Sequence, residues 1–291
     1  MLPFIRLLRP LQWLKNGFVF TPLIFSKHLF EKEYNNKAAI AFIAFCLISS
    51  TVYIINDIVD KDADKIHPVK KKRPIASGDL SVSVGVGICI VLLSLSLIIS
   101  QQLPLLFTGT IVTYFVLQLL YSFRLKHVVI LDVFIIALGF MLRIVSGAVA
   151  IDVVISNWII ITTLFLSLFL AVSKRRSELG MIQQANIETK RKVLESYSIQ
   201  YLDYALVITA TGMAISYSLY TMAERTINVF GSEHLIFTTV FVLFGIFRYL
   251  YLAINKGEGE NPTAILVKDA PMGINLILWF VTVVFIIYYS R

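Results

Sequence analysis

Apolar runs of about 20 residues recur along most of this chain, and they constrain its fold more than any other feature. A helix needs about 20 mostly apolar residues to cross the hydrocarbon core of a bilayer. Only 15% of the 291 residues are charged, whereas a soluble domain carries about 25%. We therefore predict an all-α, polytopic membrane protein in which residues 1–291 form a single transmembrane domain. Nine runs are candidate spans, near 13–30, 38–56, 82–100, 103–122, 128–151, 156–173, 203–222, 233–254 and 272–289.

The distribution of Lys and Arg predicts the orientation, because cytoplasmic loops of membrane proteins carry an excess of these residues. With the N-terminus inside, nineteen of the 26 cations fall in inside segments and five in outside segments. We therefore expect a multi-pass protein of the cell (inner) membrane with a cytoplasmic N-terminus. The two most cationic loops, about 57–81 and 174–202, then lie on the cytoplasmic side, where we expect the active site.

An acidic motif begins at Asn56, where the second predicted span ends. If the helix continues, Asn56, Asp60, Asp64 and Asp57 lie at about 0°, 40°, 80° and 100° around its axis, on one face. Such oxygen ligands suit Mg²⁺, which shares its coordination shell with substrate phosphates. A solvated acidic loop is the alternative, but an unpaired carboxylate at the membrane boundary is costly. We predict that these four residues bind Mg²⁺ and that the three aspartates are catalytic.

A basic run follows the acidic motif and ends in Arg73-Pro74. Anchoring at the cytoplasmic surface would explain most of its lysines. Arg73 differs, because Pro74 favours an extended backbone before it and Gly78 allows a sharp turn soon after. A guanidinium held in this way can bind a phosphate through two parallel hydrogen bonds. We predict that Arg73, with Lys72, binds substrate.

Other polar residues lie near the ends of predicted spans, and each has a simpler alternative explanation. Lys15 could extend its ammonium to the membrane surface, and the cations after the fourth and sixth spans could act only as topology signals. A duplicated fold would instead place the cluster after the sixth span opposite the acidic motif, which suits a substrate with two separated phosphates. On that interpretation Lys174, Arg175 and Glu178 bind substrate. Lys15 and Asn16 together would suit a phosphate or a ribose hydroxyl, and Tyr121 and Lys126, at the end of the fourth span, are further predicted substrate-binding residues.

Two ionisable residues within predicted spans need partners. Asp132 lies early in the fifth span, where Lys126 or Arg124 could pair with it. Arg143 lies in the middle of the same span, among small residues that favour close helix packing. Arg143 is therefore either part of a structural ion pair or a ligand of a lipid phosphate.

Taken together, these motifs resemble the UbiA superfamily of intramembrane prenyltransferases. The resemblance rests on Asn-Asp-x-x-Asp-x-x-x-Asp from Asn56, on Arg-Pro-Ile-Ala-Ser-Gly from Arg73, and on nine predicted spans. It implies a nine-helix bundle around a cavity that opens to lipid, and an isoprenoid diphosphate bound through Mg²⁺ between two Asp-rich motifs. Here the second Asp-rich motif is replaced by Lys-Arg-Arg-Ser-Glu-Leu at 174–179.

Three further features look like one branch of that superfamily, the decaprenyl-phosphate phosphoribosyltransferases. They are Arg-Pro-x-Gln-Trp-x-Lys-Asn at 9–16, His67-Pro68, and Lys-Arg-x-x-Glu-Leu at 174–179. Members of this branch transfer phosphoribose from phosphoribosyl diphosphate to a polyprenyl phosphate, which makes a precursor of cell-envelope arabinose. The resemblance implies that Mg²⁺ and the acidic motif bind the diphosphate. Lys174, Arg175 and Glu178 would then bind the phosphoribosyl end, with Lys15 and Asn16 nearby.

Two other functions compete with this expectation. A prenyltransferase that joins an isoprenoid diphosphate to an aromatic or other small acceptor would share the first motif, but it predicts a second acidic cluster. A transporter of an anionic metabolite would carry charges near the bilayer centre and helices broken in mid-span. As partners we expect the two substrates and the membrane, and no nucleic acid; the sequence leaves a homo-oligomer open.

Overall fold

In the computed structural model, residues 3–66, 70–185, 192–257, 259, 265 and 268–289 are described. Within these residues every regular element is a helix, which agrees with the predicted all-α class. His67 and Pro68 of the motif discussed above lie outside the described residues.

Eight helices in the described residues are long and apolar enough to cross a membrane, and they match eight of the nine predicted spans. The protein is therefore a multi-pass membrane protein. In the seventh of these spans, a short 3₁₀ helix, η4 (His234–Thr238), leads directly into α13. The helices are α3 (Lys32–Val59), α6 (Val82–Ser100), α7 (Leu105–Phe123), α8 (Leu131–Ala150), α9 (Asn157–Ala185), α11 (Ile199–Met222), α13 (Thr239–Asn255) and α15 (Ala270–Tyr289).

The first predicted span, 13–30, is not among these eight helices. After α1 (Pro3–Leu8), this part of the chain forms a 3₁₀ helix, η1 (Pro10–Phe20), and then α2 (Thr21–Phe25). An eleven-residue 3₁₀ helix is unusual, because such helices rarely exceed three or four residues. Since side chains three residues apart are aligned in a 3₁₀ helix, η1 presents three separate rows of side chains.

The predicted loops 57–81 and 174–202 also contain helix. The first holds α4 (Lys61–Lys65), η2 (Lys70–Lys72) and α5 (Pro74–Ser77). In the second, α9 continues as far as Ala185, and α10 (Lys192–Glu195) precedes α11. The charged residues after position 173 lower the hydropathy without ending the helix, so the predicted loop began too early. The remaining short helices are η3 (Leu125–His127) and α12 (Glu224–Phe230).

The chain divides into two compact units. The first unit comprises residues 1–24, 28–126 and 142–154, and the second comprises 25–27, 127–141 and 155–291. The boundary falls within α8, whose first half belongs to the second unit and whose second half belongs to the first. The prediction of a single domain over 1–291 stays a prediction.

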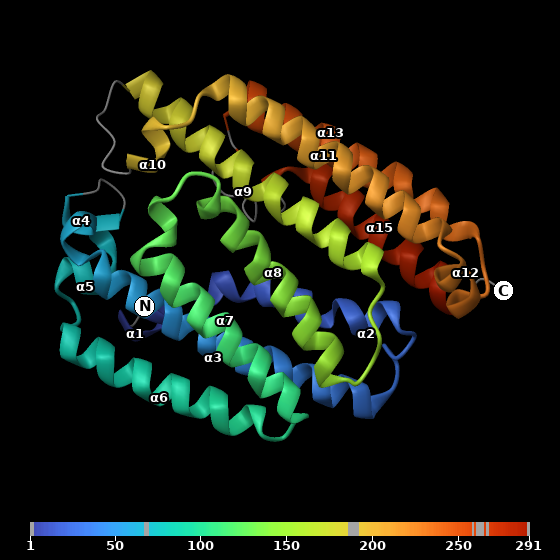
Figure 1. The fold of residues 1–291 in the computed structure, drawn as a ribbon, viewed down its shortest axis with the longest axis horizontal. Coiled ribbons are helices and arrows are strands. Elements are labelled where there is room, and N and C mark those ends of the chain that lie inside the picture. The colour runs from blue at the N-terminus through green and yellow to red at the C-terminus, as the bar shows by residue number, and fades with distance from the viewer. Residues whose placement is uncertain are drawn as a thin grey trace. The chain divides into compact units, whose positions relative to one another are not determined.

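In the first unit, α3 is the central helix, and η1, α6 and α7 pack against it (Figure 1). The core between these helices includes Phe45, Ile48, Phe107 and Ile111, all of which are fully buried. The Ser96 hydroxyl on α6 donates a hydrogen bond of 3.0 Å to the Ala44 carbonyl on α3. This packing fixes the end of α3 that carries the acidic motif.

In the second unit, α9 packs along α11, and α13 packs against α15 (Figure 1). The core of this unit includes Phe169 on α9, Leu206 on α11, and Tyr249 and Leu252 on α13. This packing fixes the last turns of α9, where the basic cluster lies.

Candidate functional site

The acidic motif lies at the end of α3 and in the short helix that follows. α3 ends at Val59, and Asp60 has φ −90° and ψ 7°, between α3 and α4. The helical hydrogen bonds nevertheless continue, because the Asp60 amide donates to the Asn56 carbonyl over 2.9 Å and the Asp64 amide donates to the Asp60 carbonyl over 2.8 Å. Asp57 and Asp64 are buried and Asp60 is half-buried. The backbone thus follows a nearly continuous helical path, as the predicted common face requires.

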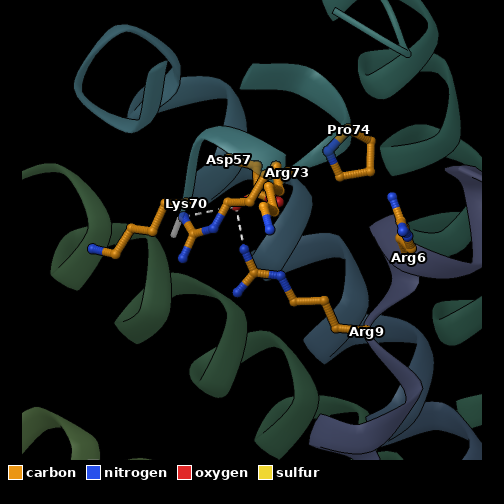
Figure 2. A pocket seen from close by; sticks show the side chains of 7 residues that line it. Arg6, Arg9, Asp57, Lys70, Arg73 and Pro74 are labelled. Carbon is orange, nitrogen blue, oxygen red and sulfur yellow. Dashed lines mark hydrogen bonds and ion pairs between the residues drawn. The ribbon is translucent and has the colours of Figure 1, made fainter. Parts of the chain in front are cut away.

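Two arginines pair with the two buried aspartates. The Arg73 guanidinium lies 2.5 Å from Asp64 Oδ2 and 3.2 Å from Asp57 Oδ1. Arg9 forms a second ion pair with Asp57 Oδ1. Figure 2 shows both guanidinium groups directed toward Asp57 from different segments of the chain. Burial lowers the pKa of the Arg9 guanidinium, and the charge of Asp57 opposes this shift.

The backbone around Arg73 has the shape that Pro74 predicts. Arg73 is extended, with φ −68° and ψ 141°, and Pro74 begins α5. Gly78 ends α5 with φ 87°, in the left-handed region where glycine has no steric penalty. These two features hold the guanidinium of Arg73 against the acidic motif.

Asp60 has a different cationic partner. Lys126, in η3, donates a hydrogen bond of 2.7 Å from Nζ to Asp60 Oδ1. The Lys126 side chain is mostly buried, with 12% of its surface exposed. Lys126 was predicted to bind substrate or to pair with Asp132, and in the structure it joins the acidic motif. Tyr121, at the end of α7, is half-buried.

A pocket of about 340 Å³ opens beside Asp57. Five cationic side chains and one carboxylate line it, so its surface is strongly positive and suits an anion. Lys72, predicted to bind substrate, is one of the exposed cations that line it. The lining residues are Arg6, Arg9, Asp57, Lys70, Lys72, Arg73 and Pro74 (Figure 2).

The oxygen donors of the acidic motif fit Mg²⁺ in their chemistry. Asn56 and the three aspartates offer hard oxygen ligands only, and Asp57 Oδ2 is buried without a hydrogen-bond partner in the described part of the chain. In these described ranges no three carboxylate, His or Cys side chains are gathered closely enough to hold a metal. Each aspartate of the motif is instead turned toward an arginine or a lysine.

Asn16, predicted to bind substrate, is fully buried in the first unit. Its side-chain oxygen accepts a hydrogen bond of 2.8 Å from Arg143 Nε, and its amide donates to the Ser49 hydroxyl over 3.1 Å. Arg143 also donates to the Tyr114 hydroxyl over 2.8 Å and lies over the Tyr114 ring. Of the two alternatives for Arg143, these contacts with the neutral side chains of Asn16 and Tyr114 favour a structural role. Lys15, the neighbour of Asn16, is half-buried.

In the second unit, the basic cluster on α9 comprises Lys174, Arg175 and Arg176, and its side chains point in different directions. Arg175 points into the protein, where 2% of its side chain is exposed, and donates to Asp132 Oδ2 and to Glu178 Oε2, each over 2.6 Å. The expected partner of Asp132 was Lys126 or Arg124, and the structure gives Arg175 instead. Lys174 is 45% exposed and lies 4.0 Å from Glu178, so Lys174 and Glu178 are the more accessible pair.

Tyr197 completes the buried network around Asp132. Its hydroxyl donates to Asp132 Oδ1 over 2.7 Å and accepts a hydrogen bond of 2.7 Å from the Ile130 amide. Burial and the hydrogen bond to Asp132 raise the pKa of Tyr197, so the hydroxyl remains a donor at neutral pH. Ile130 has φ 71°, which is uncommon for a β-branched residue, and its bond to Tyr197 holds this conformation.

Sequence reasoning assigned no substrate role to Arg6 or Arg9. Both were counted as cations of the inside segments, and Arg9 also begins the motif at 9–16, yet neither was assigned to the pocket that both line. One local signal was present, because Arg9 precedes a proline just as Arg73 does. Their proximity to Asp57, 48 residues away in the case of Arg9, depends on tertiary packing and has no local signal.

Comparison with known proteins identifies the chain. Residues 28–265 match the UbiA prenyltransferase family. The chain belongs to this family. A UbiA homolog from Archaeoglobus fulgidus, solved bound to GPP and Mg²⁺, has the same fold, with a TM-score of 0.74, 21% sequence identity, and coverage of 98% of this chain and 99% of that chain.

Two curated UbiA-type relatives match almost the full length. The decaprenyl-phosphate phosphoribosyltransferase of Mycolicibacterium smegmatis is 34% identical over 98% of this chain and 92% of its own length. The protein of the same name from Corynebacterium glutamicum is 32% identical over 98% of this chain and 86% of its own length. The chain is therefore a UbiA-type transferase, and the expected resemblance to this family is confirmed.

Proposed function

We propose that this UbiA-type enzyme transfers 5-phosphoribose from phosphoribosyl diphosphate to a polyprenyl phosphate, and that it releases diphosphate. The observation that carries the proposal is the pairing of a buried aspartate cluster with arginines beside a strongly positive pocket at the end of a membrane span. The names of the full-length relatives support this choice among UbiA-type reactions.

The acidic motif is proposed to bind the diphosphate of the donor. Asn56, Asp57, Asp60 and Asp64 would hold Mg²⁺, which when bound neutralises charge on the leaving diphosphate. Arg73 would then release the aspartates and contact a phosphate, as a guanidinium can. Lys126 would be freed from Asp60 in the same way, and Tyr121 is proposed to lie near enough to contact a phosphate oxygen.

The reaction needs little acid–base chemistry from the protein. An anionic oxygen of the acceptor phosphate forms the new bond to ribose C1, the bond from C1 to the diphosphate oxygen breaks, and the diphosphate leaves with the electron pair. The acceptor oxygen is already ionised at neutral pH, so no proton has to be removed. The main demand is stabilisation of charge on the leaving group, which preorganised cations provide.

The exposed end of the α9 cluster is proposed to serve the phosphoribosyl end of the donor. Lys174 supplies an accessible cation for the 5-phosphate, and Glu178 an acceptor for a ribose hydroxyl. Arg175 is proposed to position Glu178, because its own side chain is buried between Glu178 and Asp132. Asn16 is proposed to position Lys15 in a similar way, through its contacts with Arg143 and Ser49.

We further propose that the N-terminus and the active site face the cytoplasm, on the distribution of cations described above. A phosphoribosyl diphosphate donor is water-soluble, so a cytoplasmic site would give it direct access.

A donor comparison tests the proposed reaction. The purified protein is incubated with Mg²⁺ in two arms. One arm contains radiolabelled phosphoribosyl diphosphate and polyprenyl phosphate, and the other contains a radiolabelled isoprenoid diphosphate and an aromatic acceptor. We expect label in the lipid phase from phosphoribosyl diphosphate, in a product whose mass equals that of polyprenyl phosphate plus ribose 5-phosphate minus one water. Turnover of the isoprenoid diphosphate with an aromatic acceptor, and no transfer of phosphoribose, would instead establish the prenyltransferase alternative.

A further inference from the structure

We infer that the pocket lined by Arg6, Arg9 and Lys72 binds the phosphate head of the acceptor lipid, and that an exposed row of side chains on η1 binds the first part of its isoprenoid chain. This inference rests on the proposed function for the identity of the acceptor. It assigns the N-terminal segment, residues 3–20, to recognition of a phosphate attached to a lipid.

The pocket is positively charged, because five cations and one carboxylate line it. Arg9 and Arg73 are paired with aspartates of the acidic motif, so part of their charge is already balanced. Arg6 and Lys72 are exposed and, in the described part of the chain, form no ion pair with a carboxylate. The pocket therefore keeps a positive surface even in the ligand-free protein. A phosphate monoester carries the charge and the acceptor oxygens that arginine and lysine bind.

The 3₁₀ geometry of η1 explains why a lipid fits this pocket. One row of side chains, which includes Trp13, Asn16 and Val19, faces the protein: Trp13 donates to the Ser50 hydroxyl over 3.0 Å, and Val19 is 1% exposed. A second row is formed by Leu11, Leu14, Gly17 and Phe20. Leu11 is 80% exposed and Leu14 is 62% exposed.

This exposed row is apolar, and it begins two residues after Arg9. At about 2.0 Å of rise per residue, the part of the row from Leu11 to Gly17 spans about 12 Å. Phe20, at the end of the row, is half-buried and packs against Phe42. A Cβ atom added at Gly17 would meet nothing within 4 Å, so the row has an open space at that position. On α1, Phe4 and Ile5 are also exposed. A water-soluble anion has no use for apolar side chains next to its site, whereas a phosphate-headed isoprenoid does.

The backbone conformation of Arg9, the residue between α1 and η1, supports a binding role for this part of the chain. Arg9 has φ 53° and ψ 60°, a left-handed conformation that is unfavourable for arginine before a proline. Several contacts hold it, including the pair with Asp57, the Tyr53 ring 5.1 Å from the guanidinium, and a hydrogen bond of 2.9 Å from the Ser50 hydroxyl to the Leu8 carbonyl. Strain maintained in this way is typical of ligand-binding positions. Here it turns the chain so that Arg6, the one cation of α1, and the apolar row of η1 lie on either side of Arg9.

Binding of farnesyl phosphate to the full-length protein in nanodiscs tests the inference. The test variants are Arg6→Gln, which removes one free cation, and Gly17→Leu, which fills the open space in the row. Gly17 has no positive φ and no close neighbour, so this variant is expected to fold. The matched controls are Arg124→Gln, an exposed cation of the same unit that does not line the pocket, and Gly87→Leu, an open glycine on the exposed surface of α6.

We expect farnesyl phosphate to raise the melting temperature of the parent in proportion to its concentration, because a ligand of the native state stabilises it. We expect both test variants to bind at least about tenfold more weakly, and both controls to bind as the parent does. Farnesol and inorganic phosphate serve as separate ligands. If inorganic phosphate binds as tightly as farnesyl phosphate, or if Gly17→Leu binds farnesyl phosphate with parental affinity, the lipid assignment is overturned.

Measurements of phosphoribosyl transfer distinguish a failure of this inference from a failure of the proposed function. With Arg6→Gln we expect the KM for polyprenyl phosphate to rise about tenfold while the KM for phosphoribosyl diphosphate stays unchanged. Transfer of phosphoribose together with parental binding in both variants would refute the lipid site alone. Loss of farnesyl phosphate binding in both variants, in a protein that transfers no phosphoribose, would refute the proposed function alone.

Discussion

Single residues in this protein combine charge with deep burial, and they do so by pairing. Asp57, Asp64, Asp132 and Arg175 are each almost inaccessible to solvent, and each has at least one partner of opposite charge. A buried charge left alone is costly, especially in a protein surrounded by lipid. The pairs differ in their roles. The pair of Asp132 and Arg175 connects α8 to α9. The aspartates of the acidic motif are instead proposed to exchange their cations for a metal-bound substrate.

The Asp132–Arg175 pair gives a prediction at the residue scale. Asp132→Asn removes the fully buried one of the two carboxylates that pair with Arg175 and leaves Glu178 as its countercharge. Loss of one partner of a buried pair costs about 3–5 kcal/mol. We expect a large fall in the free energy of unfolding, measured in detergent with a chemical denaturant. The double variant Asp132→Asn/Arg175→Gln should recover part of this loss. Additive effects of the two substitutions would show that the pair does not stabilise the fold.

At the scale of elements, close approach and capping decide how helices pack. Gly147 on α8 meets η1 so closely that a Cβ atom at this position would lie 2.1 Å from the Val19 carbonyl oxygen. Asp269 precedes α15, accepts a hydrogen bond of 3.0 Å from the Met272 amide, and pairs with Arg248 on α13 over 2.7 Å. Each of these residues therefore holds two elements together.

Gly147→Ala is expected to push η1 away from α8. The added methyl group meets backbone, which cannot turn aside, and overpacking of this kind costs about 1–3 kcal/mol. The melting temperature should fall, while Gly109→Ala, at an open glycine of α7, should leave it unchanged. An equal effect of both substitutions would mean that helix propensity, not contact with Val19, determines the change.

Asp269 predicts a dependence of stability on pH. The hydrogen bond and charge of Arg248 lower the pKa of Asp269, so its contribution is complete above the usual carboxyl pKa of about 4 and is lost as the pH falls through the lowered value. Asp269→Asn keeps the helix cap but removes the charge. We expect it to melt at a lower temperature than the parent at pH 7, with a difference that shrinks below about pH 4. A difference that is constant between pH 7 and pH 3 would exclude the ion pair as its cause.

The sequence predicts elements whose signals are local. Eight spans are found where hydropathy placed them, because length and apolar composition are enough to define a membrane helix. η1 was not foreseen, since residues 10–20 fit a helix of either period and tertiary contacts from Trp13 and Asn16 select the tighter one. The end of α9 was misplaced for a related reason, because charge ends a membrane span without ending a helix.

In the candidate site, too, the sequence predicts the residues whose signals are local. The acidic motif and Arg73 could be found from the sequence, since their spacing and the following proline are local features. The partners could not, because Arg9 and Lys126 reach the motif from 48 and 66 residues away. Arg175 likewise was expected at the substrate, and its burial against Asp132 depends on how α8 and α9 pack in the second unit.

At the scale of the whole molecule, the chain is a multi-pass transferase of the UbiA family in which functional groups gather at the ends of membrane spans. The most hydropathic span, α6, buries little of its surface within the protein, since 17% of it is buried, and α15 buries 22%. These surfaces suit contact with lipid. The proposed polar chemistry lies at the ends of α3 and α9 and involves the residues that pair with them.

We propose that the aspartates at the end of α3 act through Mg²⁺ on a diphosphate. The initial rate of phosphoribosyl transfer as a function of free Mg²⁺, for the parent and for Asp64→Asn, tests it most directly. We predict no transfer in the presence of EDTA, full recovery with Mg²⁺, and a half-maximal Mg²⁺ concentration at least about tenfold higher for Asp64→Asn, the lower limit of what even an outer-shell substitution costs. Transfer at the parental rate in EDTA, or an unchanged Mg²⁺ requirement in the variant, would contradict the claim.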